Sequence, residues 1–372
     1  MVSWPTVPRF LHRELIQIAV LALVAVAAFF VTRAVAANNR GMTLRDAAEW
    51  YRRGQQQLAQ GRVDEAIASF RRATVKNRGY RVYTLALARA LMRKGDAAAA
   101  TAALLALRET DPEDAEVNLE LARLAVARHD RADALRYYHN ALYAPWAPEA
   151  AEARRRVRVE LVKFLLAQNE TSRAVSELIA LSSDLPDETA AHVEVGRLLL
   201  QASDARHAAD QFARALRIDP HDADALAGAG EAAFRLGDYQ AARSFLRTVP
   251  AGRAEIDELR EIASLVLSRD PLGNRVAGGE RRRRLEADLA HARERLRDCL
   301  APSAPQEAAA LQQESEDFAA QLETPAGRDA ETIDAGVDLI DRIERAVAIR
   351  CSPAPMDRAL LIIARRHGSD ER

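Results

Sequence analysis

Two consecutive 34-residue stretches of the chain follow one pattern of small and large residues. Residues 189–222 read TAAHVEVGRLLLQASDARHAADQFARALRIDPHD, and residues 223–256 read ADALAGAGEAAFRLGDYQAARSFLRTVPAGRAEI. Each stretch has glycine at position eight, alanine at position twenty and a large apolar residue at position twenty-four. In the second stretch a turn signal, Leu236-Gly237-Asp238, separates the two small residues. The pattern predicts two helices per stretch, packed through their small residues.

The same pattern continues toward the N-terminus and divides much of the chain into repeats. Six units are in register, with six extra residues before the fourth; they span 47–80, 81–114, 115–148, 155–188, 189–222 and 223–256. The residues that define the repeat are Gly54, Ala66, Phe70, Ala88, Ala100, Ala122, Ala134, Tyr138, Gly196, Ala208, Phe212, Gly230 and Ala242. Small residues let paired helices approach closely, and the large residue fills the space between neighbouring hairpins.

These units resemble the tetratricopeptide repeat. The first unit has Trp50 at the family's tryptophan position, and prolines such as Pro220 end three of the units. The sequence departs from the family at Gln57, where a tyrosine is usual, and at Val162, where a small residue is usual. The resemblance covers somewhat over half of the chain. It implies an all-α solenoid of helical hairpins whose concave face, lined by the first helix of each unit, binds peptides or extended partner segments.

The composition fits a helical protein and argues against two functional classes. Residues of the AVILMFWYC group make up 49% of the chain but aromatics only 5%, which favours closely packed helices over sheets. Lys and Arg number 53 and Asp and Glu 54, so a broadly basic nucleic-acid binder is disfavoured and no nucleic-acid partner is expected. Two cysteines are too few for a disulfide-rich miniprotein.

An apolar run near the N-terminus predicts a membrane anchor. Residues 15–32 contain one amide side chain, Gln17, and no charge. As a helix this run is roughly 27 Å long, close to the bilayer core of about 30 Å. Trp4 and Phe10 precede it, where interfacial aromatics are common. We expect this segment to contact lipid; a buried core helix is disfavoured because no polar face interrupts the run.

A cleaved signal peptide is the main alternative for the same segment. Ala34-Val35-Ala36 imitates a cleavage site, but Arg33 lies between it and an apolar run longer than the usual 7–15 residues. Arginines flank the run on both sides, so the charge rule leaves the orientation open. The anchor-plus-repeat layout is similar to that of membrane-anchored tetratricopeptide proteins of Gram-negative bacteria. We expect a single-pass protein of the bacterial inner membrane with a periplasmic body; a cytoplasmic body is the alternative.

Position nine of the first helices carries a row of cations. By resemblance, positions two, five, nine, twelve and thirteen of these helices point into the groove. The candidate groove residues are Tyr51 at position five and Gln55, Arg89, Arg123, Lys163 and Arg197 at position nine. Four consecutive cations would favour an acidic partner segment or a C-terminal carboxylate, because arginine binds carboxylates with two parallel hydrogen bonds.

Ion pairs within each helix are the alternative use of these cations. Position six holds a glutamate in three of the units, one turn before Arg123, Lys163 and Arg197. Such i,i+3 pairs stabilise a helix by about 0.2–0.5 kcal/mol each. In this interpretation Arg89 is the one member of the row without a partner.

The last third of the chain is predicted to be helical as well. Residues 256–267 form an amphipathic run suited to capping the last hairpin, and helices are expected over about 280–300, 306–323 and 329–350. A short amphipathic piece, 356–366, ends the chain. The predicted regions are an N-terminal stub, anchor and linker over 1–40, a solenoid over 41–256, a capping helix and linker over 257–278, and a helical bundle over 279–372.

The two cysteines lie at matching ends of two of these helices. In an up-down-up bundle the first and third helices run parallel, so Cys299 and Cys351 are brought together and can form a disulfide. Such a bridge favours an oxidising compartment, whereas two buried free thiols, the alternative, are ordinary in a reducing one.

No catalytic, cofactor or metal motif is present in the sequence. The phosphate-binding glycine patterns, the zinc-protease histidine patterns and the G-x-S-x-G elbow are all missing, and the eight histidines are scattered. We therefore expect no enzyme activity, no cofactor and no metal. The predicted function is a membrane-anchored scaffold that binds a partner protein or peptide in its concave groove, within a bacterial envelope complex. A self-associating structural protein, and an enzyme with a C-terminal active site, are the alternatives.

Overall fold

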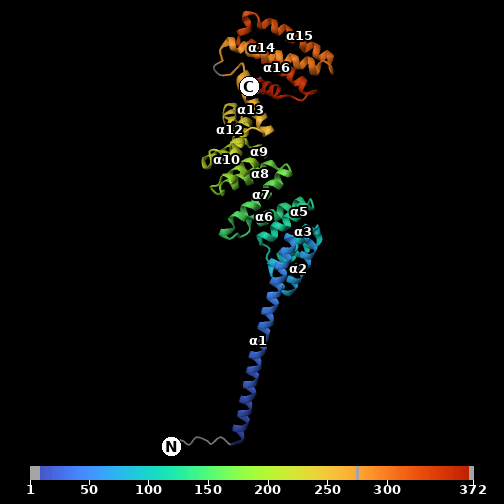
Figure 1. Ribbon diagram of the computed structural model, residues 1–372, viewed down its shortest axis with the longest axis vertical. Helices are drawn as coiled ribbons and strands as arrows, with labels where there is room; N and C mark the ends of the chain where they lie inside the picture. Colours follow the sequence, from blue (N-terminus) through green and yellow to red (C-terminus); the bar gives the residue numbers. More distant parts are fainter. Residues whose placement is uncertain (1–8, 274–275, 368–372) are drawn as a thin grey trace. The chain divides into compact units, whose positions relative to one another are not determined.

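The computed structural model describes residues 9–273 and 276–367, and within them the protein is all-α, without a β-strand (Figure 1). Each of the six predicted repeats contains two helices. The helices are α1 (Arg9–Ala59), α2 (Val63–Lys76), α3 (Arg81–Lys94), α4 (Ala97–Thr110), α5 (Ala115–Ala127), α6 (Arg131–Tyr143), α7 (Ala151–Ala167), α8 (Thr171–Ser182), α9 (Thr189–Gln201), α10 (Ala205–Ile218), α11 (Ala223–Arg235) and α12 (Tyr239–Thr248). A short 3-10 helix, η1 (Pro148–Ala150), lies where the third unit meets the six inserted residues.

The small and large residues of the repeat pattern lie in the core. All thirteen repeat-defining residues are buried. Phe70 and Phe212 are among the largest fully buried side chains, and the alanines at position twenty have no exposed surface. Burial of an alanine where two helices meet brings their backbones close, which is the physical reason for the alanine-rich composition.

Turns within the hairpins use aspartate and glycine in a recurrent way. Gly95, with φ of 86°, ends α3 in the left-handed conformation that glycine adopts without strain. Asp96 then caps α4, because its side chain accepts a hydrogen bond from the backbone N–H of Ala99 at 3.1 Å. Gly237 and Asp238 repeat the arrangement before α12. These local signals end one helix and start the next.

Helix α1 continues through residues 33–40, where the sequence predicts a linker. Figure 1 traces α1 as one helix from Arg9 to Ala59, which includes the apolar run and the first helix of the first repeat. No proline interrupts residues 33–46. Among the described residues α1 is the one helix long and apolar enough to cross a membrane; its apolar window has a mean hydropathy of 2.5 and is fully exposed. Trp4 lies outside the described residues.

The chain divides into two compact units, residues 1–161 and 162–372, and each is described by itself. In the second unit one hydrophobic cluster extends from Ala242 of the last repeat through Ile262 and Val266 into the C-terminal helices. Ile262 and Val266 belong to α13 (Ala254–Arg269), which packs on α12 and on the last helix, α17 (Pro355–His367). Helix α13 therefore covers the apolar end of the last hairpin.

The remaining helices form a bundle that packs on this cluster. They are α14 (Gly278–Arg295), the π-helical turn η2 (Leu296–Leu300), α15 (Pro305–Leu322), the 3-10 helix η3 (Pro325–Arg328) and α16 (Ala330–Ala348). Helices α14 and α16 contact each other. Cys299, in the turn that follows α14, and Cys351, just after α16, form a disulfide with 6.3 Å between the Cα atoms. Three of the arginines that open α14, Arg282, Arg283 and Arg284, contact neighbouring carboxylates; Arg282, for example, donates to Glu286 at 2.6 Å.

Candidate partner-binding groove

The cations at position nine contact carboxylates of the following repeat. Arg89 donates from Nε to Glu120 at 2.7 Å, and Lys163 donates to Glu194 at 3.0 Å. Each pair joins the first helix of one unit to the first helix of the next. In the Lys163–Glu194 pair both side chains are about half exposed, and such a pair is worth about 0–1 kcal/mol, so it aligns neighbouring repeats more than it stabilises them.

Arg123 has the most extensive of these interactions. It donates to both oxygens of Glu160, from Nε at 2.9 Å and from Nη2 at 2.5 Å, and from Nη1 to Glu120 at 2.9 Å. The hydrogen bond to Glu160 raises the pKa of the Arg123 guanidinium above its ordinary value. Glu120 is buried, and it receives hydrogen bonds from Arg123 of its own helix and from Arg89 of the preceding repeat.

These contacts correct one expectation about the row of cations. The prediction that Arg89 lacks a partner is wrong, because Glu120 of the next repeat binds it. Lys163 and Arg197 also pair forward, with Glu194 and Asp224, in place of the glutamate of their own helix. The row is therefore a chain of ion pairs between repeats, and an acidic segment would have to compete with the protein's own carboxylates.

The groove residues of the first repeat belong to an aromatic cluster. Gln55 donates to the hydroxyl of Tyr51 at 3.0 Å. The ring of Tyr51 lies 5.0 Å from that of Tyr83 and 5.8 Å from that of Phe70, measured between centroids. Tyr83 in turn packs on Tyr80 at 4.6 Å. Because Tyr83 is buried and Tyr51 is half-buried, this cluster mainly joins the first two repeats.

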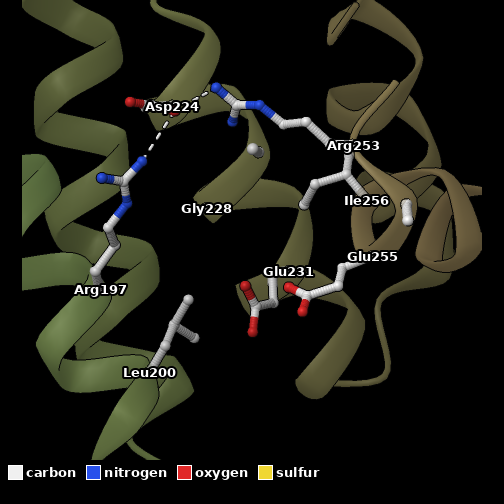
Figure 2. Close-up of a pocket in the computed structure, with 10 residues that line it drawn as sticks. Arg197, Leu200, Asp224, Gly228, Glu231, Arg253, Glu255 and Ile256 are labelled. Carbon is white, nitrogen blue, oxygen red and sulfur yellow. Dashed lines mark hydrogen bonds and ion pairs between the residues drawn. The ribbon is translucent and has the colours of Figure 1, made fainter. Parts of the chain in front are cut away.

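A pocket of about 490 Å³ lies in the second compact unit, between α9, α11 and the start of α13. Its lining consists of Arg197, Leu200, Asp224, Ala227, Gly228, Glu231, Arg253, Ala254, Glu255 and Ile256 (Figure 2). Arg197 and Leu200 occupy positions nine and twelve of their repeat, which are groove positions by resemblance. Among the predicted groove residues, Arg197 lines this pocket.

One part of the pocket is built around a shared carboxylate. Asp224 Oδ1 accepts from Arg253 at 2.7 Å and lies 2.9 Å from Nη2 of Arg197. Both arginines are about half exposed, at 48% and 52%. Hydrogen bonds from Arg253 and then from Arg197 hold the pKa of Asp224 below its ordinary value. Two guanidinium groups around one carboxylate leave a net positive charge at this part of the pocket.

The opposite charge is found elsewhere in the pocket. Figure 2 shows the carboxylates of Glu231 and Glu255 pointing into the open space, away from the Asp224 group. Arg235 donates to Glu231 at 2.5 Å, and Glu255 belongs to the first turn of α13, where a helix N-terminus favours an acidic side chain. Leu200 and Ile256 add apolar surface to the lining. The pocket thus offers a cationic part, an acidic part and apolar walls.

Sequence reasoning missed the pocket residues at the start of α13 and immediately before it. Arg253 and Glu255 fall at the end of the sixth unit, where the repeat pattern assigns no groove position. The amphipathic run of α13 predicts a cap on the last hairpin and gives no sign of a groove wall. The signal that could have found these residues is the position of α13. This helix begins within a few residues of the place where a seventh 34-residue repeat would begin.

Comparisons with known proteins give the same family. One model of the tetratricopeptide repeat matches residues 57–124 and 199–265, and a second matches 24–81 and 160–222. No curated protein matches the chain.

Several solved structures are similar in fold. YrrB, titled a TPR protein with an unusual peptide-binding site, is 20% identical over 48% of this chain and 89% of its own, with a TM-score of 0.38. PilW, a type IV pilus biogenesis factor, is 18% identical over 54% of this chain and 90% of its own, with a TM-score of 0.41. The C-terminal part of a TPR protein from Cytophaga hutchinsonii is 10% identical over 80% of this chain and 98% of its own, with a TM-score of 0.44.

Most of the matched residues fall on the helices that carry the 34-residue pattern; the second model's match begins earlier, at residue 24, and the first model's match ends in α13. Together the matched segments include more than half of the chain. The buried small residues, the paired helices and the family models all agree. This chain belongs to the tetratricopeptide repeat family, a family of protein–protein interaction scaffolds.

Proposed function

We propose that this protein is a membrane-anchored scaffold that binds an extended segment of a partner protein in the pocket between α9, α11 and α13. The observation that carries the proposal is the pocket itself. It lies on groove positions of the last two repeats, it has a volume of about 490 Å³, and it combines apolar walls with charges of both signs. Peptide sites of this kind use apolar contacts for affinity and a few placed charges for orientation.

The charges suggest what the partner segment contains. Each arginine has five N–H donors, so Arg197 and Arg253 keep free donors after binding Asp224 and can add a partner carboxylate. Glu231 and Glu255 suit a lysine or arginine elsewhere on the same segment. An apolar side chain between these charges would rest on Leu200 and Ile256. The row of cations predicted an acidic partner segment along the whole groove. We now expect one acidic residue of the partner, at the Arg197–Arg253 part of the pocket.

The exposed apolar part of α1 supports anchoring in a bilayer. Its apolar window has a mean hydropathy of 2.5, and none of it packs on the rest of the chain. Helix α1 continues without a break into the first repeat, so anchor and solenoid would be joined by a helix instead of a flexible tether. Holding the solenoid at the membrane raises the effective concentration of membrane-bound partners. We place the protein in the bacterial inner membrane, within an envelope complex, with the body in the periplasm.

Photocrosslinking from the pocket tests the binding proposal. We expect a photoreactive amino acid at Ile256 of the full-length chain, in native membranes, to form an adduct with a second protein. Arg253→Glu should reduce the yield of this adduct by about tenfold or more, because a charge-assisted hydrogen bond contributes about 1.5–3 kcal/mol. Loss of the surface pair with Asp224 should leave the fold intact.

Two controls separate pocket binding from general surface contact. Ile179 of α8 is 46% exposed and does not line the pocket, so the same photoreactive residue there should give no such adduct. Arg217→Glu changes a charge of equal sign outside the pocket and should leave the adduct at position 256 unchanged. Adducts between two copies of this chain alone would contradict the scaffold proposal and favour the self-associating structural protein.

A thiol count tests the proposed compartment. In protein purified from native membranes without reductant, we expect Cys299 and Cys351 to be bridged, so that an alkylating reagent in denaturant labels neither residue. After reduction both should be labelled. Two labelled thiols before reduction would contradict the periplasmic placement and favour a body in the reducing cytoplasm.

A further inference from the structure

Three helices of the C-terminal bundle bring a histidine and two carboxylates together. His291 belongs to α14, Glu344 to α16 and Asp357 to the first turn of α17. One ligand atom from each of these side chains lies within 4.8 Å of the other two. The site is far from the partner-binding pocket in sequence and shares no residue with it.

Asp357 is held in place by three donors. Its Oδ1 lies 2.7 Å from Nε2 of His291, and its Oδ2 lies 3.0 Å from Nη2 of Arg295. Oδ2 also accepts from the backbone N–H of Ala354 at 2.8 Å, which caps α17. The side chain is 1% exposed. Arg295 and the cap therefore occupy one oxygen and leave the other directed toward His291.

Glu344 has no such support. It is 1% exposed, and its Oε1 is buried without a hydrogen-bond partner. Buried carboxylate oxygens in folded proteins normally have partners, because removal from water costs several kcal/mol. A cation placed among the three side chains would satisfy the orphaned oxygen.

We propose that His291, Glu344 and Asp357 bind a divalent transition-metal ion of the zinc type. Imidazole nitrogen and carboxylate oxygen are both zinc ligands in proteins, and three protein ligands leave a fourth position for water. With bonds of 2.0–2.2 Å, tetrahedral ligands lie roughly 3.3–3.6 Å apart, so side-chain shifts of about 1 Å would bring the three ligand atoms to these distances. Arg295 keeps Asp357 oriented from outside the ligand set.

Access and proton balance are both compatible with this site. His291 is 27% exposed, which gives an ion a path from solvent to an otherwise buried site. When the ion binds, Nε2 of the neutral imidazole donates its lone pair to the metal and no longer donates a hydrogen bond to Asp357. The imidazole proton then resides on Nδ1, and both carboxylates bind in their deprotonated form.

Zinc stoichiometry tests the proposal. The full-length chain is purified in detergent with an affinity tag that lacks histidine, stripped with EDTA and dialysed against zinc chloride. We expect about one zinc per chain by elemental analysis, and less than a tenth of that for His291→Ala and for Glu344→Gln. Zinc should also raise the thermal unfolding temperature of the unmodified chain and leave that of His291→Ala unchanged.

A matched histidine and a second ion make the result specific. His207 also contacts an aspartate, with Nδ1 2.6 Å from Asp204, but this pair is exposed and has no third ligand, so His207→Ala should bind zinc normally. Cobalt in place of zinc should give visible d–d absorption that disappears in His291→Ala. Glu344→Gln conserves shape and decides the outcome if His291→Ala does not fold. No zinc on the unmodified chain, or equal zinc on all variants, would overturn the proposal.

Discussion

Phe212→Ala is expected to lower the free energy of unfolding by about 3–5 kcal/mol. The ring of Phe212 has no exposed surface and lies between two glycines of neighbouring repeats, Gly196 of α9 and Gly228 of α11. A Cβ added to Gly196 would lie 2.8 Å from the ring. The ring thus fills the space that both glycines leave open, and alanine would leave a cavity that rigid helices cannot close. Urea unfolding followed by circular dichroism measures the loss.

The same contact reverses the usual effect of a glycine-to-alanine change. In a helix interior, alanine normally stabilises by about 1 kcal/mol relative to glycine. At Gly228 the added Cβ would clash with the ring of Phe212, so Gly228→Ala should instead destabilise by about 1–3 kcal/mol. Combining Gly228→Ala with Phe212→Leu should recover part of the loss, because the smaller side chain makes room for the methyl group.

Gly279→Ala is the control for this pair of variants. Gly279 lies in the first turn of α14, in the same compact unit, and an added Cβ there meets no atom within 4 Å. Its replacement should be neutral or stabilising. If Gly228→Ala stabilised the protein as much as Gly279→Ala, the close packing of Phe212 between the repeats would be contradicted.

The repeat architecture could be predicted because it depends on short-range regularities. The spacing of Ala208 and Ala242 identifies one buried face per helix, and glycine–aspartate turns mark where each hairpin bends. Every repeat-defining residue lies buried in the structure. The helix that replaced the predicted linker could also have been foreseen, since nothing between Arg33 and Ala47 stops a helix apart from the mild cost of Gly41.

The ion pairs of the groove could not be predicted from helix spacing. An i,i+3 rule pairs Lys163 with Glu160 and leaves Arg89 alone, because it considers one helix at a time. In the structure the partners are 31 residues apart, in Lys163–Glu194 and Arg89–Glu120 alike. That separation is close to the repeat length, so a comparison between units would have suggested the pairs, but their contact depends on how closely neighbouring hairpins stack.

The other two candidate sites depend on tertiary contacts that no motif records. The pocket exists because the start of α13, which carries Ile256 and follows directly after Arg253, lies close to α11. His291 and Asp357 are 66 positions apart and meet through the packing of the bundle helices. A search for local metal motifs cannot find such a set, since each residue alone resembles an ordinary helix residue.

A second large effect, on the pH dependence of the free energy of unfolding, is expected at Asp288 of α14, because its carboxyl group is buried. The side chain is 2% exposed, and its Oδ1 lies 3.3 Å from Nε of Arg269 without a hydrogen bond. Burial raises the pKa of Asp288 to about 7, although Arg269 and Arg284 lower it and Asp270 raises it further. In the unfolded chain an aspartate titrates near 3.9. Between about pH 4 and 7 the folded protein therefore holds a proton that the unfolded chain has released.

It follows that this group makes the protein less stable as the pH rises from 4 to 7, with no further change above the folded pKa. At 1.36 kcal/mol per pKa unit the loss is at most about 4 kcal/mol. Asp288→Asn removes the charge and keeps the shape, so the variant should be more stable than the unmodified chain at pH 8 and equal to it near pH 4. Urea unfolding across this pH range, in EDTA so that metal binding does not contribute, measures the difference.

Asp298→Asn changes an exposed aspartate in the neighbouring turn and should leave the pH profile unchanged. Equal pH profiles for Asp288→Asn and the unmodified chain would show that Asp288 is already ionised and compensated by Arg269 in the folded state.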